Sequence, residues 1–292
     1  MRRGSLRRAL LGGIAVLPLA AAVVLPTRAA AQEVITAGNP SFTNPINANL
    51  FGTKTGVLNE TVGATLTNNG TITAPILGVN NLGGASFTTL SNNAGGTISG
   101  QTGIFNGGTI TTLNNNAGGT ISGNTTGIVN IGIITTLSNS GTISGASVGI
   151  TNRLGHSITT LTNGTGGTIS GQTGILNNGT IGALSNSGFI SGAQSGISND
   201  GTITTLSNSG TISNAVGIDN AGTIGTIINE AGGIISAGHG IQNSGTIGAL
   251  NNSGTVSGNT AIINFNLAGG GSLGTITNTG LISKPPVTVR LV

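Results

Sequence analysis

The sequence has no cysteine, tryptophan or tyrosine, and only 5% of its 292 residues are charged. The absence of cysteine excludes a disulfide framework, so stability must come from packing and backbone pairing. With 2% aromatic residues, the chain also lacks the platforms on which nucleic-acid bases stack. Few charges and much glycine are typical of disordered chains, but 36% of the residues are apolar, and they recur at fixed places.

The N-terminal segment has the layout of an export signal. A basic start, MRRGSLRR, precedes an apolar run at residues 9–25, and TRAAAQ then supplies the small residues that a signal peptidase needs. The apolar run is shorter than the roughly 20 residues of a membrane-spanning helix, and the cleavage pattern follows it directly. We therefore expect a signal peptide at residues 1–31 and a mature chain from near Gln32. The arginine pair at positions 7 and 8 leaves the twin-arginine route open beside the general secretory route.

The isoelectric point of the chain is about 11.3, and this high value comes from the N-terminal segment. Five of the nine basic residues lie within the first 28 positions. From Gln32 onward four basic and five acidic residues remain, a net charge of −1: Lys54, Arg153, Lys284 and Arg290 against Glu33, Glu60, Asp200, Asp219 and Glu230. The basic balance therefore belongs to the export signal and does not indicate a nucleic-acid-binding surface.

Beyond residue 55 the chain is a repeat of about 22 residues. Three patterns return in the same order: Thr-Ile-Ser, Gly-Ile-x-Asn and Thr-Ile-x-x-Leu-x-Asn. The apolar residue of the first pattern is found at Ile72, Ile98, Ile121, Ile143, Ile169, Ile190, Ile212, Ile235, Val256 and Ile282. The unit length varies only between the patterns, mostly by added glycine, as expected if strands are constant and corners vary.

Each pattern is a short β-branched stretch flanked by glycine, too brief for a helix. Such stretches, repeated ten times, predict an all-β fold. The architecture is a parallel β-helix (β-solenoid) of about ten rungs of about 22 residues, in which each Ile column becomes a continuous core. We expect an N-terminal cap at residues 32–55, the solenoid at 56–283, and a tail at 284–292, where Pro285 and Pro286 end the ladder.

Two spacings refine the shape of a rung. Ile203 and Leu206 are three residues apart, so both face inward only if the chain bends between them. Ile218 and Asn220 are two apart and should face the same side. The Asn column is then an inward ladder of amides that bond rung to rung, or a set of corner residues in the left-handed conformation, and the two interpretations are compatible.

Exported β-solenoids include polysaccharide lyases and hydrolases, which need clustered carboxylates, often with a basic residue or Ca²⁺. Asp200 and Asp219 lie beside column Asn residues on consecutive rungs, and Glu230 lies one rung further along. Each replaces a residue that is polar elsewhere in its column, so we interpret them as solvated charges. His156 and His239 lie about four rungs apart, too far to share a metal ion. The sequence therefore predicts no catalytic, metal-binding or cofactor-binding residue and no enzymatic activity.

Threonine offers another kind of surface. TIT occurs at residues 109–111 and 202–204, so outward Thr side chains would stand about 7 Å apart along a strand and about 4.8 Å apart between rungs. Such an array is similar to that of ice-binding β-solenoids, and ice binding is the first alternative function. Glycine at positions 182, 225 and 248 interrupts the array, however, and Thr suits any exposed strand face. A polysaccharide-active enzyme is the second alternative.

The run GTITTLSNSGTISG, followed by Gly-Ile-x-Asn and another GTI, resembles the N-terminal passenger region of bacterial autotransporters over nearly all of residues 56–283. The resemblance implies a right-handed β-helix at the cell surface, in the outer membrane or outside the cell, acting as a rigid adhesin-like stalk that contacts glycans, surfaces or other cells. It also implies a C-terminal outer-membrane β-barrel, which the sequence through Val292 does not contain. The alternatives are a passenger fragment, a truncated product, and export beside a separate barrel partner.

Overall fold

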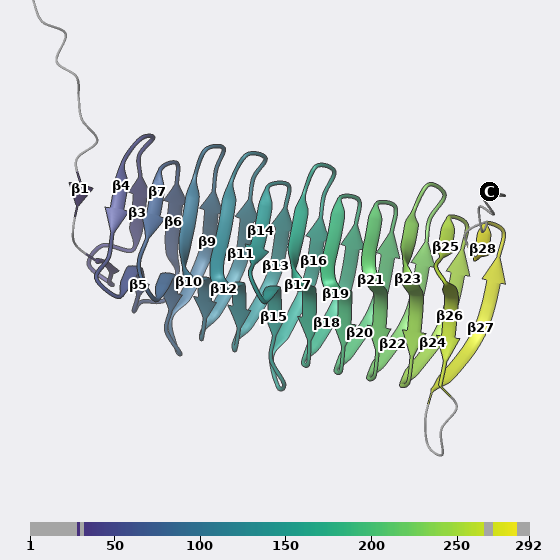
Figure 1. Ribbon diagram of the computed structural model, residues 1–292. Coiled ribbons are helices and arrows are strands. Elements are labelled where there is room, and N and C mark those ends of the chain that lie inside the picture. The colour runs from purple at the N-terminus through teal and green to yellow at the C-terminus, as the bar shows by residue number, and fades with distance from the viewer. Residues whose placement is uncertain (1–27, 30–31, 266–270, 285–292) are drawn as a thin grey trace, which may run out of the picture.

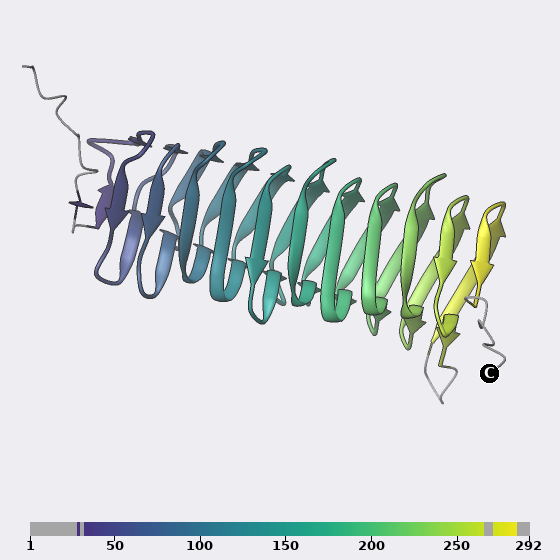
Figure 2. The ribbon, with the colours of Figure 1, turned by 45° about the horizontal axis from the view of Figure 1, so that its top comes forward.

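The computed structural model describes residues 28–29, 32–265 and 271–284. These residues form a rod of stacked rungs built from strands (Figure 1), and these ranges contain no helix. A rung is one turn of the chain. The strands form two sheets: the first sheet has 17 strands and the second sheet has 11. Each rung contributes one long strand or two short strands to the first sheet and one strand to the second. Figure 2 shows the strands of successive rungs lying side by side along the rod.

The strand bounds follow the repeat. The second sheet contains, in order, β3 (Ser41–Asn44), β6 (Ala64–Asn68), β9 (Ser86–Asn92), β11 (Thr109–Asn115), β13 (Ile133–Asn139), β16 (Ser157–Asn163), β18 (Thr180–Asn186), β20 (Thr202–Asn208), β22 (Thr223–Asn229), β24 (Thr246–Asn252) and β27 (Ser272–Asn278). The first sheet contains β1 (Arg28–Ala29), β2 (Glu33–Ile35), β4 (Asn49–Phe51), β5 (Thr55–Asn59), β7 (Thr71–Thr73), β8 (Leu77–Asn81), β10 (Thr97–Asn106), β12 (Thr120–Asn130), β14 (Thr142–Gly145), β15 (Val148–Asn152), β17 (Thr168–Asn177), β19 (Phe189–Asn199), β21 (Thr211–Asn220), β23 (Ile234–Asn243), β25 (Thr255–Ser257), β26 (Thr260–Asn264) and β28 (Leu281–Ser283).

Each strand pairs in parallel with its equivalent one rung away. Ile203, for example, is opposite Ile181 on one side and Ile224 on the other. The predicted all-β parallel solenoid is confirmed. The second sheet has eleven strands in the described ranges, so the rod has eleven rungs there. This is one more than the ten repeats of the sequence, because residues 33–51 also form a rung.

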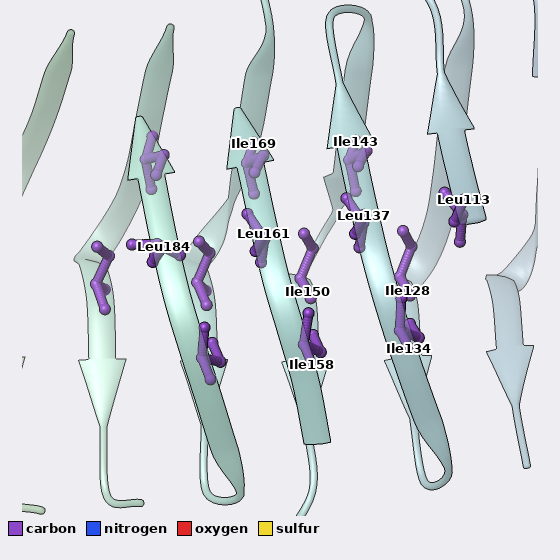
Figure 3. Packing of buried hydrophobic residues seen from close by; sticks show 14 of the residues in the cluster. Leu113, Ile128, Ile134, Leu137, Ile143, Ile150, Ile158, Leu161, Ile169 and Leu184 are labelled. Carbon is purple, nitrogen blue, oxygen red and sulfur yellow. The ribbon is translucent and has the colours of Figure 1, made fainter. Parts of the chain in front are cut away.

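Isoleucine and leucine columns fill the space between the sheets (Figure 3). In that view Leu137, Ile143 and Ile150, from three strands of one rung, point into the same interior. Ile203 and Leu206 are both fully buried, and the ladder between rungs skips the exposed Thr204 that lies between them. The predicted bend is confirmed, because only a turned backbone lets side chains three residues apart face the same interior.

Two columns of asparagine also lie inside the rod, except that the last residue of each, Asn264 and Asn278, is exposed. The first Asn ladder ends each Gly-Ile-x-Asn stretch and consists of Asn59, Asn81, Asn106, Asn130, Asn152, Asn177, Asn199, Asn220, Asn243 and Asn264. The second Asn ladder ends each strand of the second sheet and consists of Asn44, Asn68, Asn92, Asn115, Asn139, Asn163, Asn186, Asn208, Asn229, Asn252 and Asn278. In both ladders each side-chain N–H donates to the Oδ1 of the next Asn at 2.6–2.8 Å.

The side chains of the buried ladder residues find their hydrogen-bond partners within the protein. Asn199 is fully buried, and its Nδ2 donates to Asn220 Oδ1 at 2.7 Å and to the carbonyl oxygens of Gly201 at 3.2 Å and Thr223 at 3.1 Å. Within the described ranges only Asn47 and Asn214 are non-glycine residues with positive φ, and neither belongs to a ladder. The inward amide ladder is therefore confirmed, and the left-handed conformation is not adopted by the ladder residues.

The corners absorb the variation in rung length, as the sequence predicts. The longer corners, such as NNAGGT, contain a glycine in the left-handed region, which a side chain would strain. All positive-φ glycines of the described residues lie in corners of this kind: Gly63, Gly84, Gly95, Gly118, Gly155, Gly166 and Gly232.

The first rung closes the N-terminal end. The strands β2, β3 and β4, expected as a cap, pair in register with β5, β6 and β7. Ile35 is fully buried and Leu50 is 6% exposed, so this rung both begins and covers the core. Of the predicted signal peptide the structure describes only β1, which pairs with β4. Its cleavage, like the predicted stop at Pro285 and Pro286, concerns residues outside the described ranges.

The core predicts a sharp contrast between two adjacent positions of β20. Ile203→Asp places an unpaired charge in the interior and should destabilise the protein by about 4 kcal/mol or more. Thr204→Asp, at an exposed position outside the ladder, should change the free energy of unfolding by about 0.5 kcal/mol or less. Urea denaturation followed by circular dichroism measures both, and equal losses would contradict the inward orientation of Ile203.

The second Asn ladder allows an equally close comparison in β11. Asn115→Ala removes the acceptor of Asn92 and the donor to Asn139, and it should cost about 1–3 kcal/mol for each buried group left unpaired. Asn114→Ala, at the half-exposed neighbouring position, should be close to neutral. If denaturation midpoints of the two variants coincide, the ladder does not contribute to stability.

Candidate functional site

Two of the three predicted surface carboxylates come together. Asp219 lies in β21 between Ser198 and Gln242 of the neighbouring rungs, and its Oδ1 accepts a hydrogen bond from Gln242 Nε2 at 3.2 Å. Asp200 follows β19 at the corner of the rung before, near enough for its charge to act on Asp219. The proximity expected from consecutive rungs is therefore present.

The surroundings of Asp219 change its acidity. Its pKa is raised above the ordinary value of 3.8, first because partial burial disfavours the charged form. The hydrogen bond from Gln242 opposes this effect, and the negative charge of Asp200 adds to it. The pair is a small acidic feature on an otherwise weakly charged rod, with an amide donor on one side.

The remaining candidates lie elsewhere. Glu230 is at the corner after β22, in the second sheet, where its Oε1 accepts a hydrogen bond from the Ser207 hydroxyl at 3.2 Å. His156 lies in the corner before β16, and His239 lies in β23 with a buried Nδ1 that has no hydrogen-bond partner. Within the described part of the chain, no three His, Cys, Asp or Glu side chains are placed to hold a metal ion.

The predicted threonine array lies on the second sheet and is interrupted. Thr111 and Thr204 are exposed, as expected for an outward column. Gly182 replaces Thr between them, and Gly225 and Gly248 follow on later rungs. The two Thr columns expected from the TIT pattern are therefore not continuous along the second sheet.

Another hydroxyl array lies on the first sheet, on either side of the Ile of the Thr-Ile-Ser pattern. Five consecutive rungs stack Thr in register at one position, and Thr or Ser two residues further on: Thr71, Thr97, Thr120, Thr142 and Thr168, beside Thr73, Ser99, Ser122, Ser144 and Ser170. The hydroxyls of Ser99 and Thr73 are hydrogen-bonded at 2.8 Å. Phe189 and Ile234 take the Thr position on later rungs. The signal was present in the sequence, because these residues flank the first-column Ile.

A third column on the outside of the strands varies from rung to rung. It is the position between Ile and Asn in each Gly-Ile-x-Asn stretch, which alternates with two buried neighbours. Its residues are in turn Leu58, Asn80, Phe105, Val129, Thr151, Leu176, Ser198, Asp219, Gln242 and Ile263. The inward columns are nearly constant, so chemical variety is confined to the outside of the rod.

Comparison with known proteins does not assign the chain to a family. No family model, no curated protein and no solved structure matches the chain. Among the residues that the structure describes, no helix is long and apolar enough to cross a bilayer. The fold and its outward columns therefore carry the functional argument.

The acidic pair predicts a measurable pH dependence. Because the pKa of Asp219 is raised in the folded protein, its ionised form lowers stability at neutral pH, and this cost disappears as the pH falls below the ordinary value of 3.8. Asp219→Asn keeps an acceptor for Gln242 and should be more stable than the parent at neutral pH, with the difference shrinking in acid. Thr204→Ala, an exposed substitution that involves no titratable group, is the control and should reproduce the pH dependence of the parent. Denaturation at several pH values tests this, and a parent that gains no stability relative to Asp219→Asn in acid would contradict it.

Proposed function

We propose that this chain is an exported, adhesin-like stalk, similar to the passenger region of a bacterial autotransporter, that presents a repeated polar surface outside the cell. The observation that carries the proposal is the in-register stacking of eleven rungs, which repeats the same outward positions along the whole rod. A repeated surface suits work done by reach and multiplicity rather than by a single pocket. An outer-membrane β-barrel is the partner expected to anchor such a stalk.

The interior supports the role of a stiff spacer. Eleven rungs at about 4.8 Å each span about 50 Å. The Ile columns and both Asn ladders connect neighbouring rungs throughout the rod, so bending it would separate hydrogen-bonded pairs on one side. A rod of this kind can hold its outer surface at a distance from the membrane.

The outer surface supports contact through many weak bonds. The Thr and Ser array on the first sheet offers hydroxyl donors and acceptors at the rung spacing, about 4.8 Å. Glycan hydroxyls can exchange hydrogen bonds with such groups, each bond being weak in water. Several such contacts on one stalk, and many stalks on one cell, add up by avidity.

A second candidate, ice binding, is favoured by the same array. Thr71, Thr97, Thr120, Thr142 and Thr168 occupy one column without a break, and Thr or Ser fills the column beside it on the same five rungs. The column is only two residues wide with its Ser neighbours, and Phe189 ends it on the next rung. Contact with glycans or cells needs no lattice match, and for this reason we place adhesion first.

Surface display tests the proposal. Residues 32–292, exported and fused to an outer-membrane anchor, should increase aggregation of the host cells or their attachment to a glycan-coated surface. The control is a variant with Thr97→Val, Thr120→Val and Thr142→Val, which keeps β-branched side chains but removes three outward hydroxyls. It should be displayed at the same level and attach less.

The purified protein should cause no thermal hysteresis in freezing water. Thermal hysteresis together with unchanged attachment would exclude the adhesin function and favour ice binding. Attachment that is equal in the parent and the valine variant would show that the hydroxyl array is not the contact surface.

A further inference from the structure

The Thr column of the first sheet changes its pattern in the second half of the rod. There, apolar and Thr side chains alternate from rung to rung, in register, as Thr168, Phe189, Thr211, Ile234, Thr255 and Leu281. The three apolar side chains are not part of the core, since Phe189 is 41%, Ile234 40% and Leu281 53% exposed. Every second rung therefore presents a large apolar side chain to the solvent at the same position.

An unbroken column of serine lies beside this alternating column. It is two residues further along each strand and consists of Ser191, Ser213, Ser236, Ser257 and Ser283. The hydroxyls of Ser236 and Ser257 are hydrogen-bonded at 3.1 Å. The strands β19, β21, β23, β25 and β28 follow one another along the rod (Figure 1), so the two columns run side by side along its axis. We call the two columns from Phe189 to Ser283 the alternating strip.

The alternating strip is uncharged. Neither of its columns contains an acidic or basic residue. Glu230 lies in the corner before β23 and Lys284 follows β28, so the margins carry one charge of each sign. Charge complementarity favours a neutral ligand here over an anionic or a cationic polymer.

The period of the strip matches a particular kind of sugar chain. Rungs are about 4.8 Å apart, so the apolar side chains recur at about 9.6 Å along the axis. In an extended β-1,4-linked glycan each sugar is turned over relative to the one before, and the chain repeats every two sugars, over close to two rung spacings. Every second ring of such a chain can therefore lie on Phe189, Ile234 or Leu281.

The chemistry of the strip fits the same ligand. A glucose-type ring carries C–H groups on its faces and hydroxyl groups at its rim. Covering the C–H face with an apolar side chain removes apolar surface from water, which is favourable. The rim hydroxyls can exchange hydrogen bonds with the Ser column, because a Ser hydroxyl both donates and accepts.

We propose that the alternating strip binds an extended, uncharged β-1,4-linked glycan that lies along the rod axis. Phe189, Ile234 and Leu281 contact every second sugar ring, and the Ser column hydrogen-bonds to the hydroxyls at the rim. The inference names the class of glycan and its contact surface, and in this respect it rests on the proposed function.

Binding of soluble oligosaccharides to the purified chain tests the proposal. Cellohexaose, a β-1,4-linked chain of six glucose units, should bind in titration calorimetry, whereas maltohexaose, the α-1,4-linked chain of the same units, should bind at least about tenfold more weakly. Phe189→Thr combined with Ile234→Thr should weaken the binding of cellohexaose about tenfold or more, because two apolar contacts are lost. Thr occupies this position on neighbouring rungs, so the variant should fold as the parent does.

The second sheet offers a matched control. Ile133 is 48% exposed and lies between Thr109 and Ser157 of the neighbouring rungs. Ile133→Thr therefore removes an exposed apolar side chain of the same kind from another face, and it should leave the binding of cellohexaose unchanged. Equal weakening by Ile133→Thr would overturn the assignment to the strip.

A swap within the strip tests the period itself. Thr211→Ile combined with Ile234→Thr keeps the composition of the column but moves the middle apolar side chain by one rung. The swapped chain should bind cellohexaose as weakly as the Ile234→Thr single variant. Binding as tight as that of the parent would mean that the two-rung period is not used.

The remaining outcomes separate this inference from the proposed function. A parent that does not bind cellohexaose overturns the inference, and attachment of cells that display the stalk would then leave the adhesin function standing. Binding of cellohexaose without such attachment would contradict the adhesin function and support the strip. Sedimentation of the parent as a dimer that Phe189→Thr dissociates would mean that a second copy covers the strip, and would also overturn the inference.

Discussion

A buried amide must find a hydrogen-bond partner, and in this protein the partner is the same residue one rung away. Asn199 is fully buried because Asn177 donates to it and because it donates in turn to Asn220. An isolated rung would leave those donors and acceptors unpaired inside an apolar core. The ladder therefore requires neighbouring rungs of the same design, and this requirement explains why the sequence repeats so closely.

The same stacking restricts the residues beside the ladder. At Gly103 an added Cβ would lie 2.6 Å from the carbonyl oxygen of Gly127, so the rungs approach too closely there for any side chain. Corners tolerate more variation, because an extra residue bulges outward without disturbing the columns. Low sequence complexity here is thus a consequence of close packing between identical layers, and not of disorder.

Variation that cannot enter the interior appears on the outward columns. One column contains Phe105, Val129, Thr151 and Asp219 on different rungs, while the Ile and Asn on either side of these residues remain the same. Charges follow the same rule: Asp219 is tolerated at an outward position, where Gln242 donates to it and burial is incomplete. The inward residues thus determine the rod-shaped fold, whereas the outward residues can vary without disturbing it.

Much of this could be predicted because strand geometry is local. The spacing of Ile218 and Asn220 indicated an inward Asn, and the spacing of Ile203 and Leu206 indicated a bend. The second Asn ladder follows from the same argument, since Leu206 and Asn208 are also two residues apart. Periodicity alone was enough to predict a parallel solenoid and the places where its corners vary.

Other features depended on the register between rungs that are 21 to 26 residues apart in the chain. Only the folded rod shows that Gln242 Nε2 donates a hydrogen bond to Asp219 and that the hydroxyls of Thr73 and Ser99 are hydrogen-bonded to each other. The sequence alone determined which side of each strand faces the core, because side chains alternate within a few residues. The tertiary structure alone decided which outward side chains bond to each other, because this depends on how distant segments stack.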